Sequence, residues 1–428
     1  MTEAIEVAGA TRLRNWAGNV TFSARSTSRP GSIRELQSIV ATAAKVRVLG
    51  SGHSFNRIAD TTDELVRVDR LPPIIELDSA LAQVRVSAGQ QYGQLITAVQ
   101  AAGFALPNLA SLPHISIGGA CSTSTHGSGD HNQMLAASVR AVKLVTASGD
   151  VIEIDATAPG FGGSVLALGA LGVMTQLTLQ LVDTFQMQQF VYELRDLTPV
   201  VDSLGDVLSA AYSTSVFTDW RPGGRTLVWL KHRVDNSSPR KPEATWLGGR
   251  LARNAQHPLP GGSTESTTRQ LGEVGPWNDR LPHFRLEFVP SQGAELQSEY
   301  FVARADAAAA MRVLLSLHEQ LRPVLLVSEV RSIAADELWL SPAHRQETVA
   351  FHFTWIKDEP AVRSVLATLE AALAPFGALP HWGKVSVAAP ASVRAGYAHF
   401  EDFRQLVAEL DPGQKFRNEL LDDYLSPT

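Results

Sequence analysis

The sequence has almost no cysteine, because Cys121 is the only one in 428 residues. A single cysteine excludes an internal disulfide and a metal site built from cysteines alone. Basic blocks are also missing and the net charge is −6, which argues against nucleic acid or an anionic membrane as a partner. No apolar run reaches membrane-spanning length, and residues 1–16 lack the apolar core of a signal peptide. We therefore expect a cytoplasmic protein with no membrane or nucleic-acid partner.

Length and apolar patterning predict two domains of the α+β class, with two sheets built by different parts of the chain. A chain of 428 residues exceeds what one hydrophobic core usually holds. Helices are expected over 32–44, 91–103, 200–212, 306–321, 361–375 and 400–425. Strands are expected over 45–49, 64–68, 74–77, 83–86, 139–146, 151–155, 175–181, 213–220, 226–231, 285–289, 325–333 and 348–355, with a polar loop over 235–276.

The strand over 45–49 runs into the turn Gly50-Ser51-Gly52, which is followed by His53. Two glycines around a serine leave backbone N–H groups pointing outward, and such concave nests bind phosphates. A Rossmann fingerprint is excluded because its third glycine would fall on Phe55, and a P-loop is excluded because no Gly-Lys-Ser/Thr is present. Taken alone, the turn is more often structural, and a turn histidine commonly caps nearby carbonyls.

A second segment of small residues, 106–129, gives that turn more weight. It has too little apolar bulk for a core segment and too much for a linker. Its backbone around 116–119 and 123–129 offers another run of N–H groups. Two such loops in one domain favour a large, phosphate-bearing cofactor over a lone phosphate.

The strands over 325–333 and 348–355 carry a second group of candidate residues. Glu329 and Arg331 are two residues apart, as are His352 and Thr354, so each pair points to one face of its strand. The opposite face of the second strand is apolar and presents Phe351, Phe353 and Trp355. For any single strand, a solvated face with a Glu–Arg ion pair is the commoner explanation.

Several segments together resemble the vanillyl-alcohol oxidase family of flavoproteins, and within it the alditol oxidases (xylitol or sorbitol oxidases). The loop 47–54 is similar to the pyrophosphate loop of that family. The other matching segments are Asn15-Trp16-Ala17-Gly18-Asn19, 106–129, Leu171-Gly172-Val173, His283-Phe284-Arg285, His381-Trp382-Gly383-Lys384 and 411–418. The resemblance covers nearly the whole chain.

This resemblance implies a bipartite FAD-binding domain over 1–190 and 381–428, with a cap domain containing an antiparallel sheet over 191–380. It also implies FAD bound covalently through His53, the histidine that carries the flavin in many members. Members with a second flavin bond use a cysteine near the position of Leu112, so one bond is expected here. The implied cofactor-binding residues are Arg47, Val48, Leu49, Gly50, Ser51, Gly52, His53, Ser54, Ser111, Ser116, Gly119, Thr123, Thr125, His126, Gly172, Val173, Lys415 and Asn418.

The resemblance further implies oxidation of a terminal alcohol of xylitol or sorbitol, with hydride transfer to flavin N5 and reduction of O2 to H2O2. The implied substrate-binding residues are Ser111, Glu329, Arg331, Thr354 and Lys384. Arg331 and Lys384 are expected to stabilise the developing alkoxide, with Glu329 orienting another hydroxyl and His352 assisting as a catalytic residue. A small residue at Ala110 is expected to leave oxygen a path to the flavin, and a monomer is expected.

Two other functions remain open from the sequence. One is a sugar-lactone oxidase or dehydrogenase of the same flavin family, which would differ in its substrate and electron acceptor. The other is a flavin-binding protein without turnover, which would have no catalytic rate to lose when Lys384 or Arg331 is replaced. No metal is expected, because no pair of the 12 histidines has helical metal-ligand spacing with an acidic partner. His114, His283 and His381 are expected to be ordinary histidines, and Cys121 a small buried residue.

Overall fold

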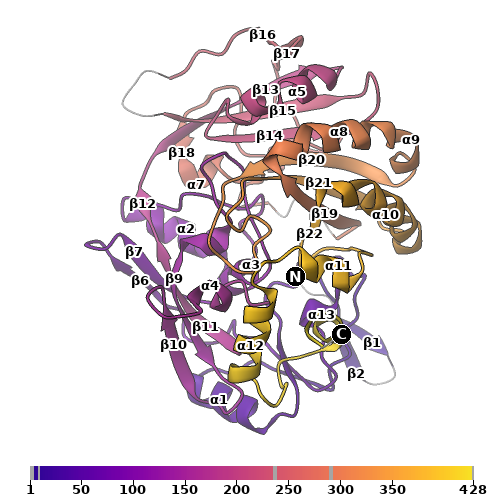
Figure 1. Ribbon diagram of the computed structural model, residues 1–428. Helices are drawn as coiled ribbons and strands as arrows, with labels where there is room; N and C mark the ends of the chain where they lie inside the picture. The colour runs from indigo at the N-terminus through magenta and orange to yellow at the C-terminus, as the bar shows by residue number, and fades with distance from the viewer. Residues whose placement is uncertain (1–3, 8–9, 235–238, 289–292, 427–428) are drawn as a thin grey trace.

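The computed structural model describes residues 4–7, 10–234, 239–288 and 293–426. It contains a large antiparallel sheet in one half of the molecule and smaller sheets in the other (Figure 1). Helices and antiparallel strands are mixed along the chain, so the predicted α+β class is confirmed. Within the described residues, no helix has both the length and the apolar character needed to cross a membrane.

A three-stranded parallel sheet presents the glycine turn. Its order is β3-β5-β4, and the strand β4 (Val46–Val48) ends just before Gly50, inside the predicted strand 45–49. Helix α1 (Ile33–Thr42) precedes β4, and Ser32 caps its N-terminus as a hydroxyl acceptor for the backbone N–H of Glu35. The other two strands are β3 (Ser26–Ser28) and β5 (Glu64–Val66).

A five-stranded antiparallel sheet of order β10-β9-β11-β7-β6 supports the second small-residue segment. Its strands are β6 (Ile75–Asp78), β7 (Gln83–Ser87), β9 (Val139–Val145), β10 (Val151–Asp155) and β11 (Val173–Gln180). Helices of this half are α2 (Tyr92–Ala101), α3 (Ile117–Cys121) and α4 (Phe161–Ser164). Short pairs join β1 (Ala4–Val7) to β2 (Ala10–Leu13) and β8 (Phe104–Ala105) to β12 (Val182–Asp183).

The large sheet is ten-stranded and runs in the order β16-β17-β13-β15-β14-β20-β21-β19-β22, with β18 paired to β13. Its long strands are β13 (Gln186–Leu194), β14 (Ser213–Thr218), β15 (Thr226–Val234), β19 (Glu295–Ala303), β20 (Leu325–Ile333) and β21 (Thr348–Ile356). Its short strands are β16 (Thr245–Trp246), β17 (Gly249–Leu251), β18 (Gly275–Pro276) and β22 (Leu379–Pro380). Three of these short strands lie in the segment predicted to be a polar loop.

The outer face of this sheet is covered by helices, as Figure 1 shows for α8 and α10. Phe351, Phe353 and Trp355 are fully buried beneath them, as the alternating pattern of β21 predicts. The covering helices are α5 (Thr198–Asp202), α6 (Leu204–Leu208), α8 (Ala307–Ser316), α9 (His318–Leu321) and α10 (Glu359–Leu373). The other face of the sheet is therefore left for the site.

Two expectations about this half are wrong, and two of its long strands were not predicted. The helix predicted over 200–212 is two short helices that end at Leu208, because β14 begins at Ser213. The strand predicted over 285–289 is absent from its described part, residues 285–288, and the preceding Phe284 forms an isolated bridge to Thr267. The strands β13 and β19 were not predicted, and β19 lies ten residues beyond the start of the misplaced strand.

The C-terminal segment packs against the half that contains the glycine turn. Phe403 and Leu421 belong to the same buried cluster as Leu95 of α2 and Leu177 of β11. The backbone N–H of Val46 also donates to the carbonyl of Lys415. The helices of this segment are α11 (Pro390–Ala395), α12 (Phe400–Leu410) and α13 (Glu419–Leu425). The domain limits at 190 and 380 stay predictions.

Candidate active site

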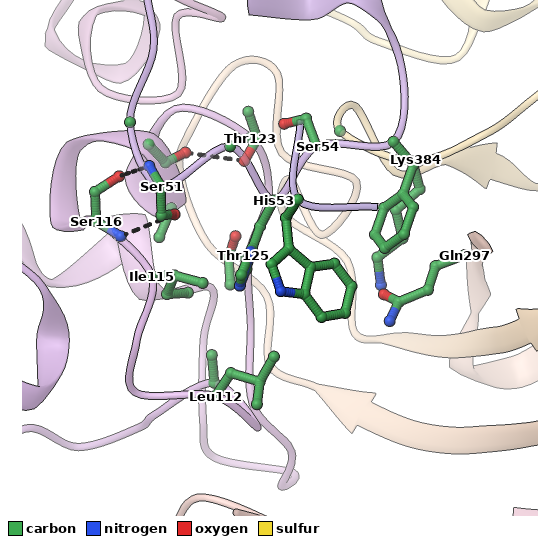
Figure 2. Close-up of a pocket in the computed structure, with 18 of the residues that line it drawn as sticks. Ser51, His53, Ser54, Leu112, Ile115, Ser116, Thr123, Thr125, Gln297 and Lys384 are labelled. Atoms are coloured by element: carbon green, nitrogen blue, oxygen red, sulfur yellow. Dashed lines mark hydrogen bonds between the residues drawn. The ribbon is translucent and has the colours of Figure 1, made fainter. Parts of the chain in front are cut away.

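A long cavity separates the free face of the large sheet from the two small-residue loops (Figure 2). It holds about 2390 Å³ of space between atoms, including open solvent at its mouth. In Figure 2, His53 lies between the Ser51–Ser116 pair on one side and Lys384 and Gln297 on the other. The lining includes every residue predicted at this site except Gly172, Val173, Lys415 and Asn418.

The glycine turn is locked against the second loop by a reciprocal pair of hydrogen bonds. The N–H of Ser51 donates to Ser116 Oγ at 3.2 Å, and the N–H of Ser116 donates to Ser51 Oγ at 3.3 Å (Figure 2). A Cβ at Gly50 would overlap the Ser116 hydroxyl, so the approach of the two loops requires glycine there. The backbone N–H groups of Gly52, His53 and Ser54 have no hydrogen-bond acceptor among the described residues. They are available to an anion in the cavity.

His53 stands at the end of this turn with an unpartnered ring nitrogen. Its Nδ1 is buried, and no described residue forms a hydrogen bond with it. The ring packs 4.8 Å from the ring of Trp16, centroid to centroid. Burial lowers the pKa of His53 to about 4, so its imidazole is neutral at neutral pH. A buried nitrogen without a partner is costly, which favours a bond to a group bound in the cavity.

Arg47 reaches the cavity but also holds this half of the protein together. Its guanidinium donates to the carbonyls of Ile58, Leu168, Gly169 and Phe416, which come from three separate segments. Burial lowers the pKa of Arg47 to about 10, and it therefore remains cationic. Arg47 thus fixes the base of the turn mainly through protein contacts.

Four residues expected to bind the cofactor lie outside the cavity lining. A Cβ at Gly172 would crowd the carbonyl of Val145, and Val173 is buried in the small cluster around Leu36. Lys415 Nζ donates to the carbonyls of Val40, Ala41 and Ala147. Asn418 caps α13 and donates to carbonyls of Arg57, Ile58 and Asp60. In the structure, these residues close the fold behind the cavity.

The sheet face opposite the turn carries a row of polar residues. Cross-strand pairing sets Glu299 of β19 beside His352 of β21, and His352 beside Glu329 of β20. Arg331 and Thr354 flank this row on the same face, and Lys384 enters from the segment that follows β22. The period-two pattern of β20 and β21 thus identified four residues that the fold brings together.

Glu299 is the member of the site that the sequence analysis missed. Its Oε1 lies 3.1 Å from Arg331 Nη2, and its Oε2 lies 2.7 Å from Lys384 Nζ. Burial opposes ionisation of Glu299, but Lys384 and His126 outweigh burial and hold the pKa of its carboxyl well below the usual range. The alternation of Glu295, Gln297 and Glu299 with apolar and small residues could have identified this strand and its polar face.

A short hydrogen-bond chain orients Thr354 toward the cavity. Lys384 Nζ lies 2.8 Å from His352 Nδ1, and His352 Nε2 lies 3.2 Å from Thr354 Oγ1. Burial and the neighbouring Lys384 lower the pKa of His352 to about 3, so its ring is neutral. An ammonium group only donates, so Nδ1 accepts and Nε2 carries the proton that is donated to Thr354. The Thr354 hydroxyl proton is then available to a ligand.

The remaining predicted residues complete the wall. Ser111 Oγ lies 3.4 Å from Arg331 Nη1, and Ala110 lines the cavity beside it. His126, expected to contact the cofactor, donates from Nδ1 to the carbonyl of Gly127, and its Nε2 lies 3.2 Å from Glu299 Oε1. Among the described residues, no group of three or more His, Cys, Asp and Glu side chains could hold a metal.

These features fit FAD. The turn supplies free N–H groups for a pyrophosphate, the cavity extends from the turn to the charged sheet face, and His53 offers an unpartnered nitrogen at the boundary. The residues fit to hold the cofactor are therefore the turn 50–54, the loop around Ser116 and Thr123, and His53.

Comparisons with known proteins agree with this geometry. Residues 25–155 match the FAD binding domain family, and residues 292–424 match the D-arabinono-1,4-lactone oxidase family. The L-gulono-1,4-lactone dehydrogenase of Mycobacterium tuberculosis is 28% identical over 435 residues, covering 96% of this chain and 99% of its own. The crystal structure of cholesterol oxidase from B. sterolicum superposes with a TM-score of 0.76 at 13% identity, covering 99% of this chain and 97% of that one, which confirms the predicted fold.

The alditol oxidase of a Streptomyces species (strain IKD472 / FERM P-14339) is 48% identical over 421 residues. The alignment covers 97% of this chain and 99% of that protein, so it includes both the glycine turn and the charged sheet face. The chain therefore belongs to the alditol oxidase family of vanillyl-alcohol oxidase-type FAD-binding flavoproteins.

Proposed function

We propose that this protein is an FAD-dependent alditol oxidase that converts the terminal CH2OH of xylitol or sorbitol into an aldehyde, with O2 as electron acceptor. The observation that carries the proposal is the pairing of Arg331 and Lys384 through Glu299 in a cavity that also contains His53. The chemistry that FAD supplies when bound is acceptance of a hydride from the alcohol carbon and transfer of both electrons to O2, so that the hydroxyl proton and the hydrogen of the hydride both end in H2O2.

Arg331 and Lys384 stabilise the oxygen of the reacting alcohol as it loses its proton. Arg331 is buried and Lys384 is mostly buried, with 6% and 14% of their side chains exposed, so their attraction for a developing alkoxide is weakly screened by water. Glu299 holds the two cations at a fixed separation before substrate arrives, which removes reorganisation from the reaction step. His352 contributes no charge, because it is neutral, and serves to orient Lys384 and Thr354.

The other hydroxyls of the polyol are recognised by alternating acceptors and donors. Glu329 accepts, while Ser111 and Thr354 can both donate and accept, which suits a row of hydroxyl groups. A charged acceptor and a hydroxyl donor also favour a flexible polyol over an apolar alcohol. This recognition pattern supports an alditol as the substrate.

We further propose that His53 carries the flavin covalently and that Ala110 leaves dioxygen a path to it. The unpartnered Nδ1 supports the first point, and the small side chain lining the cavity supports the second. Ala110→Val is expected to slow flavin reoxidation in stopped-flow measurements and to leave anaerobic reduction by xylitol unchanged. Equal slowing of both half-reactions would contradict a role in oxygen access.

The protein is also proposed to be a cytoplasmic monomer. The single buried Cys121 supports a reducing compartment, where structural disulfides are rare. Cell fractionation tests the location, and light scattering during size-exclusion chromatography tests the monomer.

The test of the main activity is peroxide release during a scan of alditols and sugar lactones. Release with xylitol or sorbitol, and none with lactones, is the expected result. A lactone oxidase or dehydrogenase is the second candidate, favoured by the match of residues 292–424 to a lactone oxidase family. Turnover of lactones with an artificial acceptor and none with polyols would support that candidate and overturn the proposal.

A further inference from the structure

A buried lysine on the same sheet face as Glu329 has no place in the activity described above. Lys231 lies in β15, two strands away from Glu329, and only 1% of its surface is exposed. Its Nζ lies 2.6 Å from the carbonyl oxygen of Leu281, 2.7 Å from that of Pro282 and 3.3 Å from His283 Nδ1. Burial lowers the pKa of Lys231 well below its usual range, and Glu329 partly offsets burial. The three acceptors around Nζ match the three protons of an ammonium group, so the geometry assigns the charged form.

His283 links this lysine to the cavity. Its Nε2 lies 2.7 Å from Glu329 Oε1, and its ring lines the cavity with edge contacts to Phe217 and Trp229. The main chain at His283 and Phe284 donates two N–H bonds to the carbonyl of Ser111. The same residue therefore contacts both the loop that carries Ser111 and the strand that carries Glu329.

The geometry determines which nitrogen of His283 carries the proton. A 2.7 Å contact with a carboxylate requires a proton on Nε2, since two acceptors would repel one another at that distance. Nδ1 must then accept from Lys231, because a second proton there would face an ammonium group in a buried site. Burial and Lys231 agree with this assignment by lowering the pKa of His283 to about 4.

On the basis of the proposed function, we propose that Lys231 and His283 are positioning residues that fix the carboxylate of Glu329 for one hydroxyl of the polyol. The Nε2–H of His283 donates a hydrogen bond to Glu329 Oε1, which also lies 3.5 Å from Arg331 Nε. Oε2 is left to accept from substrate. Glu329 thus accepts the proton of a substrate hydroxyl in a hydrogen bond. The orientation of its carboxylate is set through His283 by Lys231, which does not contact the substrate.

The test compares Lys231→Met, His283→Gln and the double variant. Glutamine places an amide N–H near the position of Nε2 and needs no lysine to choose its protonation state. If Lys231 acts through the His283 ring, Lys231→Met raises the KM for xylitol about 10- to 100-fold with a smaller change in kcat, the loss typical of a charge-assisted hydrogen bond. In the His283→Gln background, Lys231→Met should change the KM for xylitol by less than about threefold.

A series of monodeoxy xylitols identifies the hydroxyl that Glu329 accepts. The analogue that lacks this hydroxyl should already have a raised KM in the unaltered protein, and Lys231→Met should not raise that KM further. Equal sensitivity of every analogue, or an equal effect of Lys231→Met in both backgrounds, would overturn the proposal. Flavin content and thermal unfolding exclude variants that have lost the fold.

Ring-nitrogen NMR of histidine-labelled protein gives a readout that does not depend on turnover. His283, assigned by comparison with His283→Gln, should be neutral with the proton on Nε2. Lys231→Met removes the cation that opposes a second proton on Nδ1, so the ring should become doubly protonated at a higher pH than in the unaltered protein. A doubly protonated ring or a proton on Nδ1 in the unaltered protein would overturn the proposal. Failure of the unaltered protein to oxidise any polyol would instead contradict the proposed function, and the tautomer would still be measurable.

Discussion

Lys384 Nζ lies 2.7 Å from Glu299 Oε2, and the other oxygen of the same carboxylate lies 3.1 Å from Arg331 Nη2. The two cations proposed to stabilise the reacting oxygen are therefore held by one shared anion. Glu299 is 1% exposed, so no water molecule can readily replace it as a partner. The charge arrangement of the site depends on this carboxylate as much as on the cations themselves.

Replacing Glu299 with glutamine should lower kcat by about 100-fold, in the range seen when one preorganised electrostatic contact is lost. The amide has nearly the same shape, but it cannot hold two cations against their mutual repulsion. Anaerobic reduction of the flavin by xylitol, followed by absorbance, measures the step directly. Flavin content should stay unchanged, because Glu299 is far from the glycine turn in sequence and lies on the opposite wall of the cavity.

Asp130→Asn is the matched control for that change. Asp130 also forms an ion pair with a guanidinium, that of Arg304, but it does not line the cavity. Its loss should affect stability without lowering the rate of flavin reduction. A comparable loss of rate in both variants would show that Glu299 acts on the fold in general.

The contrast between Glu299 and Glu329 shows which residues of the site could be predicted from the sequence and which could not. Glu329 was identified because it lies two residues from Arg331 in a predicted strand and matches a substrate-binding residue of the family that the chain resembles. Glu299 was missed because the strand of this region was assigned to 285–289, where the residues alternate in a similar way. A strand forms only where partners are available, and β19 has β21 and β22 on its two sides, whereas Phe284 has a single bridge to Thr267.

Lys415 and Asn418 show a second limit of sequence reasoning. A family motif places them near the cofactor domain, and the fold does bring them there. Their side chains, however, already donate hydrogen bonds to backbone carbonyls of α1 and of the segment 57–60. Motif residues that complete helix ends look the same in sequence as residues that contact a ligand.

The pH dependence of the reaction should have an alkaline limit set by Lys384. Burial lowers the pKa of Lys384 below its ordinary value of 10.5, although Glu299 partly offsets burial. A cationic Lys384 is present below this pKa and lost above it, so kcat/KM should fall as pH rises through the lowered value. His352 stays neutral across the assay range because its pKa is about 3, so it adds no acidic limit.

Glu299→Gln should move that alkaline limit to lower pH, because it removes the group that raises the pKa of Lys384. Arg331 and His352 then remain beside Lys384 without a compensating anion on that side. Rate profiles of the two proteins between about pH 6 and pH 10 measure the shift. A limit that stays in place, or that persists in Lys384→Met, would assign the titration to another group.

Replacing His53 with alanine should release the flavin from covalent attachment. In the unaltered protein, the yellow colour should remain with the precipitate after acid denaturation, and in His53→Ala it should appear in the supernatant. Thermal stability without flavin should change little, because His53 Nδ1 forms no hydrogen bond with any residue that the structure describes. His114→Ala is the control, because His114 is near enough to His53 to lower its pKa but does not belong to the cavity lining and contacts the carbonyl of Leu286 instead. This variant should retain the colour in the precipitate.

The contact between Gly50 and Ser116 predicts a pair of substitutions with opposite effects. A Cβ at Gly50 would overlap Ser116 Oγ, so Gly50→Ala should force the two loops apart and destabilise the holoprotein by about 1–3 kcal/mol. Bound flavin should also decrease, because the N–H groups of the turn lose their arrangement. Adding Ser116→Ala removes the overlapping hydroxyl and should restore part of the stability and part of the bound flavin. It also removes the acceptor of the hydrogen bond from the N–H of Ser51. Thermal unfolding and the flavin-to-protein absorbance ratio measure the effects, and a double variant worse than Gly50→Ala would show that the hydrogen bond matters more than the close approach.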